Sequence, residues 1–172
     1  LQRQGDIANV FFPADGNTTL AVLEKILSST NHINVIVAGK TQEPRWLTPE
    51  LAKQNLNSGI MKWDFASDDD PQVVLSAAGD YLTTESLAAI DIVKSDFPDA
   101  RLRFVNILSL SSCGLGTTET CLTVEGFNEL FTPDKPVVCN FHGYPQTLKS
   151  ILFDYIHSSP QRFSIHGYIE SG

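Results

Sequence analysis

The segment Val-Val-Leu-Ser-Ala-Ala-Gly, residues 73–79, has the composition of a buried β-strand that ends at a glycine. Four apolar residues then recur at three- and four-residue spacing, as on one face of a helix: Leu87, Ile90, Val93 and Phe97. Thr83 or Thr84 is expected to cap this helix, and Pro98 to stop it. A second apolar run at 102–108 follows, so the order predicts parallel strands joined by a right-handed crossover.

The same alternation extends to both sides of this unit. Further short strands are predicted at 9–12, 33–38, 137–141 and 163–166. Shorter helices are predicted at 123–131 and 146–157, and the polar, glycine-containing segment 109–123 is predicted to be a loop. The whole pattern predicts a three-layer α/β/α domain, with a mostly parallel sheet of about five strands and helices on both faces.

Two helix starts carry recognisable signals. Asn17 stands where an N-cap belongs, before an apolar stripe formed by Leu20, Leu23 and Leu27. The second helix begins at Thr48-Pro49-Glu50, because proline suits the first turn and an acidic residue suits the positive end of the helix dipole. Gly59 is the expected stop of that helix.

Length and composition exclude several classes of protein. A chain of 172 residues is the size of one domain and buries roughly 70% of its unfolded surface. With 42% hydrophobic and 19% charged residues, it is neither disordered nor collagen-like. The net charge of −8 argues against nucleic acid or an anionic membrane as a partner, and no apolar run is long enough to span a membrane.

Three widely spaced cysteines, Cys113, Cys121 and Cys139, form no disulfide framework. Because the N-terminus also lacks a signal-peptide pattern, we expect free, mostly buried thiols in a cytoplasmic protein. The first residue is Leu1 and not Met, which we interpret as a piece of a longer polypeptide or a processed chain.

Several possible motifs are weak. Gly114, Gly116 and Glu119 depart from a dinucleotide-binding fingerprint at the third glycine. Cys139 and His142 lack the second ligand pair of a zinc site, and the acidic run 68–70 is interpreted as a solvated loop.

Polar residues that follow strands are better candidates. Lys40 comes directly after an apolar strand and Gly39, which places one cation where a backbone without a side chain can approach an anion. An ordinary surface lysine is the alternative. Arg45 and Trp46 could frame such a site or pack against the next helix. His142 and Tyr144 follow the strand at 137–141, and both packing and catalysis remain open for them.

Short blocks in a fixed order resemble the C-terminal third of the thiamine diphosphate-dependent phosphoketolases that cleave xylulose 5-phosphate or fructose 6-phosphate. The blocks are Phe-Phe-Pro-Ala-Asp-Gly-Asn at 11–17, Ile-Asn-Val-Ile-Val-Ala-Gly-Lys at 33–40, Trp-Leu at 46–47, Ala-Ala-Gly-Asp at 77–80, Val-Asn at 105–106, Leu-Phe-Thr-Pro-Asp-Lys-Pro at 130–136, Phe-His-Gly-Tyr-Pro at 141–145 and His-Gly-Tyr at 166–168. Each block is short, but together they span nearly all of the chain.

The resemblance implies the C-terminal domain of a transketolase-like lyase. Such an enzyme converts its sugar phosphate and inorganic phosphate to acetyl phosphate, an aldose phosphate and water, and it acts as a homodimer with thiamine diphosphate and a divalent metal such as magnesium. Residues 1–40 look like the end of the preceding pyrimidine-type domain, and 41–172 like a truncated C-terminal domain. The nearest approach to the cofactor motif, Gly79-Asp80-Tyr81, lacks a second glycine, so cofactor and metal are expected in the preceding domains.

Only Lys40 is carried over as a functional residue, since the lysine of the family's Ala-Gly-Lys run is similar to one that reaches the substrate's phosphate group. The chain departs from the pattern at Thr41, where Gln is expected, and at 154–157, where many members have Tyr-Asp-Arg-Pro. Two alternatives remain: a free-standing α/β binding or regulatory module, and the C-terminal domain of another transketolase-like enzyme.

Overall fold

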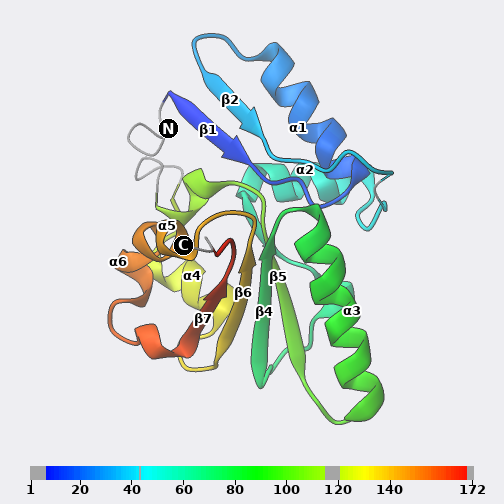
Figure 1. The fold of residues 1–172 in the computed structure, drawn as a ribbon, viewed down its shortest axis with the longest axis vertical. Coiled ribbons are helices and arrows are strands. Elements are labelled where there is room, and N and C mark those ends of the chain that lie inside the picture. The colour runs from blue at the N-terminus through cyan, green and yellow to red at the C-terminus, as the bar shows by residue number, and fades with distance from the viewer. Residues whose placement is uncertain (1–6, 43, 115–120, 170–172) are drawn as a thin grey trace.

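A five-stranded sheet forms the centre of the molecule (Figure 1). The computed structural model describes residues 7–42, 44–114 and 121–169. The strand order is β3-β5-β4-β6-β7, and every pairing is parallel except that of β3 with β5. The strands are β3 (Ile60–Lys62), β4 (Val73–Ala78), β5 (Leu102–Ile107), β6 (Val137–Phe141) and β7 (Phe163–His166). The predicted fold class is confirmed.

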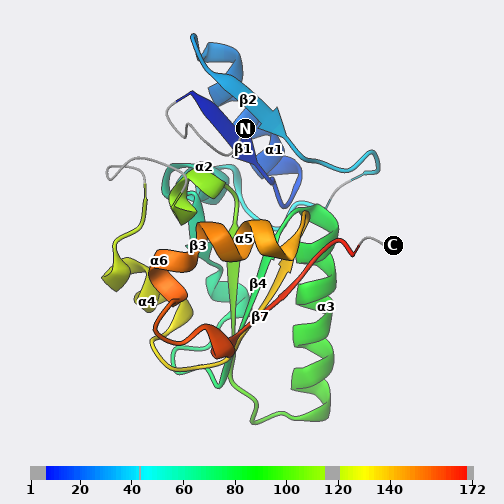
Figure 2. The ribbon, with the colours of Figure 1, turned by 60° about the vertical axis from the view of Figure 1, so that its left-hand side comes forward.

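Helices cover both faces of this sheet (Figures 1 and 2). One face carries α2 (Pro49–Ser58) and α3 (Asp80–Asp96). The other face carries α4 (Val124–Phe131), α5 (Pro145–Ile151) and α6 (Phe153–Ile156). Short 3₁₀ turns occur in the described connections: η1 (Asp64–Ala66), η2 (Leu110–Cys113) and η3 (Pro160–Arg162).

Strand β5 shows how one segment serves two cores. All six of its residues are buried, as expected for a parallel strand covered on both faces. Leu102 and Phe104 pack in the core on the α2 and α3 side, and Val105 and Ile107 pack in the core on the opposite side. The side chains alternate because successive Cβ atoms of a strand point to opposite faces.

The strands predicted at 9–12 and 33–38 exist, but they form a separate two-stranded parallel sheet. It consists of β1 (Ala8–Phe11) and β2 (Ile33–Ile36), connected by α1 (Gly16–Ser28). Figure 1 shows this unit above the end of the main sheet. Hydrogen bonds from Phe12 N to Leu108 O, 2.8 Å, and from Gly16 N to Pro44 O, 2.9 Å, join the unit to the rest of the chain.

Helix α1 begins and packs differently from the prediction. Its N-cap is Asp15 and not Asn17, because the Asp15 carboxylate is buried and accepts from Thr18 N at 2.7 Å and from Leu47 N at 2.8 Å. The predicted apolar stripe is wrong, since Leu20 is 58% exposed and Leu27 is 82% exposed. The buried face consists of smaller residues, Thr18, Ala21 and Val22, which allow a close approach to the neighbouring helix α2.

Of the other predicted helix boundaries, some are confirmed and some are wrong. The predicted start and stop of α2 are confirmed: Thr48 Oγ1 accepts from Leu51 N, and Gly59 ends the helix with φ of 70°. Helix α3 starts before the expected threonines, at Asp80, with Gly79 as its N-cap. Phe97, expected in its buried stripe, is 66% exposed. The helix predicted at 146–157 is divided at Leu152 into α5 and α6.

No helix in the described part of the chain has both the length and the apolar composition needed to cross a lipid bilayer.

Candidate functional site

The carboxyl ends of β4, β6 and β7 meet at one edge of the sheet. Strand β4 lies between β5 and β6, so the chain runs to one side of β4 first and then returns to its other side. This reversal is a topological switch point, where open α/β sheets place their ligands outside the strand ends. The segments that leave the strands here begin at Gly79, His142 and Gly167.

Lys40 lies beside the same edge, although it comes from the two-stranded unit. After β2 the chain passes to the start of α3, where Gly39 N donates to the Asp80 carboxylate. Thr41 Oγ1 lies 2.8 Å from Tyr81 OH. The Lys40 side chain is exposed, and it forms no ion pair within residues 7–42, 44–114 and 121–169.

Asp80 is the residue that sequence reasoning missed. The sequence gives Asp80 a place in a family block and in an incomplete cofactor motif but no role in a site, yet its side chain is buried and both carboxylate oxygens accept hydrogen bonds. Oδ1 accepts from Tyr81 N at 2.7 Å, and Oδ2 accepts from Gly39 N. Asp80 is not part of any group of three His, Cys, Asp or Glu side chains, within the described residues, that could hold a metal ion. An aspartate at the first position of a helix, after a strand and a glycine, was the available signal.

His142 packs against the turn that precedes α3. Its backbone N–H donates to Ala78 O at 3.2 Å, and a Cβ atom placed on Gly79 would lie 3.1 Å from His142 Nδ1. Gly79 has φ of 114°, so glycine is required here both by backbone conformation and by the imidazole above it. The imidazole also packs edge-on with the Tyr168 ring, with 5.4 Å between the ring centroids. These contacts favour packing for His142.

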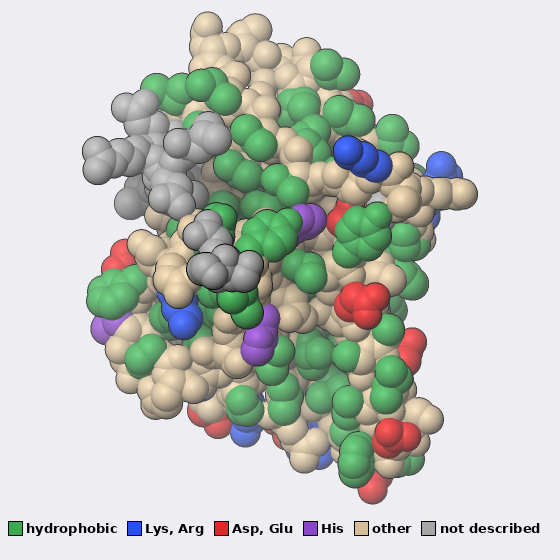
Figure 3. All heavy atoms as spheres, viewed as in Figure 1, with side chains coloured by type: hydrophobic (Ala, Val, Ile, Leu, Met, Phe, Trp, Pro, Cys, Tyr) green, Lys and Arg blue, Asp and Glu red, His purple; other side chains and the backbone are tan. Residues whose placement is uncertain are grey.

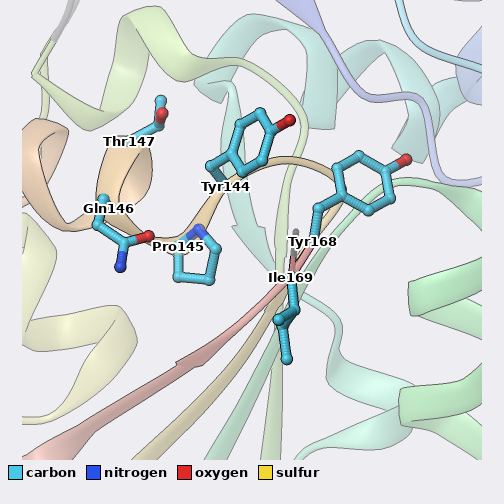
Figure 4. A pocket seen from close by; sticks show the side chains of 6 residues that line it. All are labelled: Tyr144, Pro145, Gln146, Thr147, Tyr168 and Ile169. Carbon is cyan, nitrogen blue, oxygen red and sulfur yellow. The ribbon is translucent and has the colours of Figure 1, made fainter. Parts of the chain in front are cut away.

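Two hollows flank Tyr168. The first, of about 400 Å³, is lined by Tyr81, Leu82, Asn140, Phe141, His142, His166, Gly167 and Tyr168. The second, of about 550 Å³, is lined by the residues labelled in Figure 4, in which the rings of Tyr144 and Tyr168 lie side by side. Figure 3 shows histidine side chains among hydrophobic ones on this face. The edge is therefore aromatic and mostly apolar, with Lys40 beside it.

The remaining candidates lie elsewhere. Arg45 lies against Gly16 at the start of α1, and Trp46 lines a hollow with residues of α3. In the acidic loop, the Asp68 carboxylate accepts from Leu102 N and pairs with Lys94, and these contacts lower the pKa of Asp68. These contacts hold the acidic loop against β5 and α3.

Among the described residues, no three His, Cys, Asp or Glu side chains come together in a way that could hold a metal ion. Part of the weak glycine motif falls outside the described residues, since Gly116 and Glu119 lie within 115–120.

All three cysteines are free, as predicted, and two of them are buried. Desolvation raises the pKa of the Cys139 thiol to about 12, and burial also raises the pKa of Cys113. Neither thiol has the thiolate character that a nucleophile needs at neutral pH.

This burial predicts selective alkylation. At pH 8 in the folded protein, iodoacetamide should modify Cys113 and Cys139 at least roughly 100-fold more slowly than an exposed thiol, because the reactive thiolate is scarce and shielded. After denaturation without reductant, mass spectrometry should find three modified cysteines. A native disulfide, or rapid labelling of both buried thiols, would contradict the prediction.

Comparison with known proteins identifies the family that this sequence matches. The profile of the XFP C-terminal domain matches residues 40–172. Proteins named probable phosphoketolase are similar over almost the whole chain: one from Pseudomonas putida is 41% identical over 99% of it, and one from Mesorhizobium japonicum is 39% identical over 100%. A Brucella abortus protein of the same name is 36% identical over 99%.

The chain spans about 22% of the length of each of these relatives. With the confirmed α/β/α fold and a family profile that covers most of its residues, the chain belongs to the XFP C-terminal domain family.

Proposed function

We propose that this domain serves a thiamine diphosphate-dependent phosphoketolase that cleaves xylulose 5-phosphate or fructose 6-phosphate with inorganic phosphate. The products are acetyl phosphate, an aldose phosphate and water. Within that enzyme, Lys40 binds the phosphate group of the sugar. The relatives' shared name supports the reaction class. The family's Ala-Gly-Lys run and the position of Lys40 beside the carboxyl edge of the sheet support the role of Lys40.

The observation that carries the role of Lys40 is an exposed cation on a fastened loop. Its backbone neighbours on both sides are bonded to the start of α3, next to the switch point of the sheet. A lysine ammonium is a compact charge with three donors, which suits a phosphate group. An exposed lysine with no ion pair in the described part of the chain keeps those donors available.

We further propose that residues 1–40 are the end of a preceding pyrimidine-type domain and that 41–172 form the C-terminal domain. Support comes from the separate β1–β2 sheet and from apolar side chains that the described residues leave exposed. Leu20, Leu27 and Ile33 are each more than half exposed on this unit. Such surfaces in a two-stranded unit suit further strands and helices of a larger domain.

Thiamine diphosphate and a divalent metal such as magnesium belong, in this proposal, to the preceding domains. Bound there, they supply the carbanion chemistry that cleaves the sugar carbon–carbon bond. The contribution of this chain is to hold the far, phosphorylated end of the substrate. We also propose a cytoplasmic homodimer, in keeping with the reduced thiols and the sugar phosphate substrate.

The isolated chain is expected to fold but to be inert. Isothermal titration calorimetry with thiamine diphosphate and magnesium should show no micromolar binding, and an acetyl phosphate assay should show no turnover. The full-length enzyme is the positive control and should form acetyl phosphate from xylulose 5-phosphate or fructose 6-phosphate only when inorganic phosphate is present. Turnover by the isolated chain, or a full-length enzyme that ignores both sugars, would refute the proposal.

A further inference from the structure

The loop that carries Lys40 has no regular structure of its own, yet its backbone is held at a buried point. Gly39 N donates to Oδ2 of Asp80, whose residue is only 2% exposed. The other oxygen, Oδ1, accepts from Tyr81 N at the first turn of α3. Asp80 therefore ties the residue before Lys40 to the start of a 17-residue helix, where a carboxylate is stabilised by the helix dipole.

The residue after Lys40 is held by a second contact. Thr41 Oγ1 and Tyr81 OH lie 2.8 Å apart, and either hydroxyl can be the donor. Tyr81 is 49% exposed, but its position follows from the helix α3, in which it is the second residue. The loop is thus fastened on both sides of Lys40 by two consecutive residues of α3.

This fastening addresses a general weakness of lysine as a phosphate ligand. A lysine on a free loop would have to order both its backbone and its long side chain when the substrate binds, and that ordering costs conformational entropy. When the backbone is already fixed, only the side chain remains to be ordered, so binding is tighter.

We propose that Asp80 and Tyr81 are positioning residues, which hold the Lys40 backbone where its ammonium meets the substrate phosphate. The inference rests on the proposed role of Lys40 and extends it to two residues that act through the Lys40 backbone. It also gives a purpose to the buried carboxylate in the Gly79-Asp80-Tyr81 segment.

The experiment measures kcat and KM of the full-length enzyme with a phosphorylated ketose and with an unphosphorylated ketose. Tyr81→Phe removes only the hydroxyl and should raise KM for the phosphorylated sugar about three- to ten-fold, with little change in kcat. Asp80→Asn keeps the shape but replaces one acceptor with an amide that cannot accept, so the effect should be at least as large. Turnover of the unphosphorylated sugar should not change.

The decisive comparison is the double variant. If Tyr81 acts through Lys40, Tyr81→Phe should have no further effect on KM in a Lys40→Ala background. Tyr155→Phe is the matched control, because it also removes a tyrosine hydroxyl that makes a hydrogen bond, 2.7 Å to Leu122 O. Tyr155 belongs to α6, which lies on the opposite side of the main sheet from α3 (Figure 1). The control should leave KM unchanged.

Hydrogen–deuterium exchange gives a readout besides activity. Peptides that contain residues 37–42 should exchange faster in Asp80→Asn and in Tyr81→Phe than in wild type, and at the wild-type rate in Tyr155→Phe. If exchange of residues 37–42 is unchanged in both Asp80→Asn and Tyr81→Phe, these two side chains do not hold the Lys40 loop and the inference is wrong.

The outcomes separate the two proposals. If Lys40→Ala leaves KM unchanged, the role of Lys40 is wrong and the positioning role falls with it. If Lys40→Ala raises KM but neither Asp80→Asn nor Tyr81→Phe does, only the positioning inference is wrong. Equal effects of Tyr81→Phe with and without Lys40 also overturn it.

Discussion

Replacing Lys40 with alanine in the full-length enzyme is expected to lower kcat/KM for a phosphorylated ketose about 10- to 150-fold. The substitution removes a charge-assisted hydrogen bond worth roughly 1.5 to 3 kcal/mol. At about 1.4 kcal/mol for each factor of ten, that loss gives the stated range. Most of the change should appear in KM, since the phosphate lies away from the bond that breaks and is bound alike in ground and transition states.

Two further measurements make the Lys40→Ala result specific. Lys40→Arg should recover only part of the activity, because a planar guanidinium does not replace a compact ammonium at a fitted site. An unphosphorylated ketose, turned over poorly by any variant, should be indifferent to the change. Equal impairment of both sugars, in a protein that remains folded, would return Lys40 to the status of an ordinary surface lysine.

Phe104→Ala is expected to destabilise the domain by about 3 to 5 kcal/mol, the usual cost of removing a fully buried phenyl group. Phe104 is 0% exposed at the middle of β5, and its ring meets the edge of Trp63 with 5.2 Å between centroids. For a domain of this size each kcal/mol lowers the melting temperature by roughly 2 to 4 °C. Thermal unfolding followed by circular dichroism should therefore show a fall on the order of 6 to 20 °C.

The control for Phe104→Ala is another phenylalanine that the sequence pattern placed in a buried stripe. Phe97 is 66% exposed at the end of α3, so Phe97→Ala should change stability by no more than about 0.5 kcal/mol. If Phe104→Ala and Phe97→Ala have the same melting temperature, the assignment of Phe104 to the core and of Phe97 to the surface is wrong.

The elements that were predicted well have strong local signals. The strand at 137–141 is found with the expected bounds, because its apolar run is closed by Pro136 on one side and by polar residues on the other. Helix α2 has both a capping threonine and a terminal glycine, and each residue performs the predicted role. Signals of this kind act within a few residues, so they survive without knowledge of the tertiary structure.

Other features depend on partners that a pattern does not reveal. Strand β3 was missed because three residues are too few to show alternation, and only its antiparallel pairing with β5 makes it a strand. The leucines of α1 form a regular stripe, but regular spacing does not tell which face meets the rest of the molecule. The hydrogen bond from Gly39 N to the Asp80 carboxylate joins residues 41 positions apart, and no local motif encodes such a contact.

The position of β4 between β5 and β6 bears on how the chain folds as it is synthesised. Strand β5 follows β4 closely, so that flank of β4 can pair early, but the other flank must wait for β6, which begins at Val137. Until then an apolar strand presents an open row of backbone N–H and C=O groups, the kind of edge that recruits strands from other chains. Late closure by non-local contacts slows folding and lengthens the exposure to aggregation. We therefore expect chains arrested on the ribosome before residue 137 to be the most dependent on chaperones.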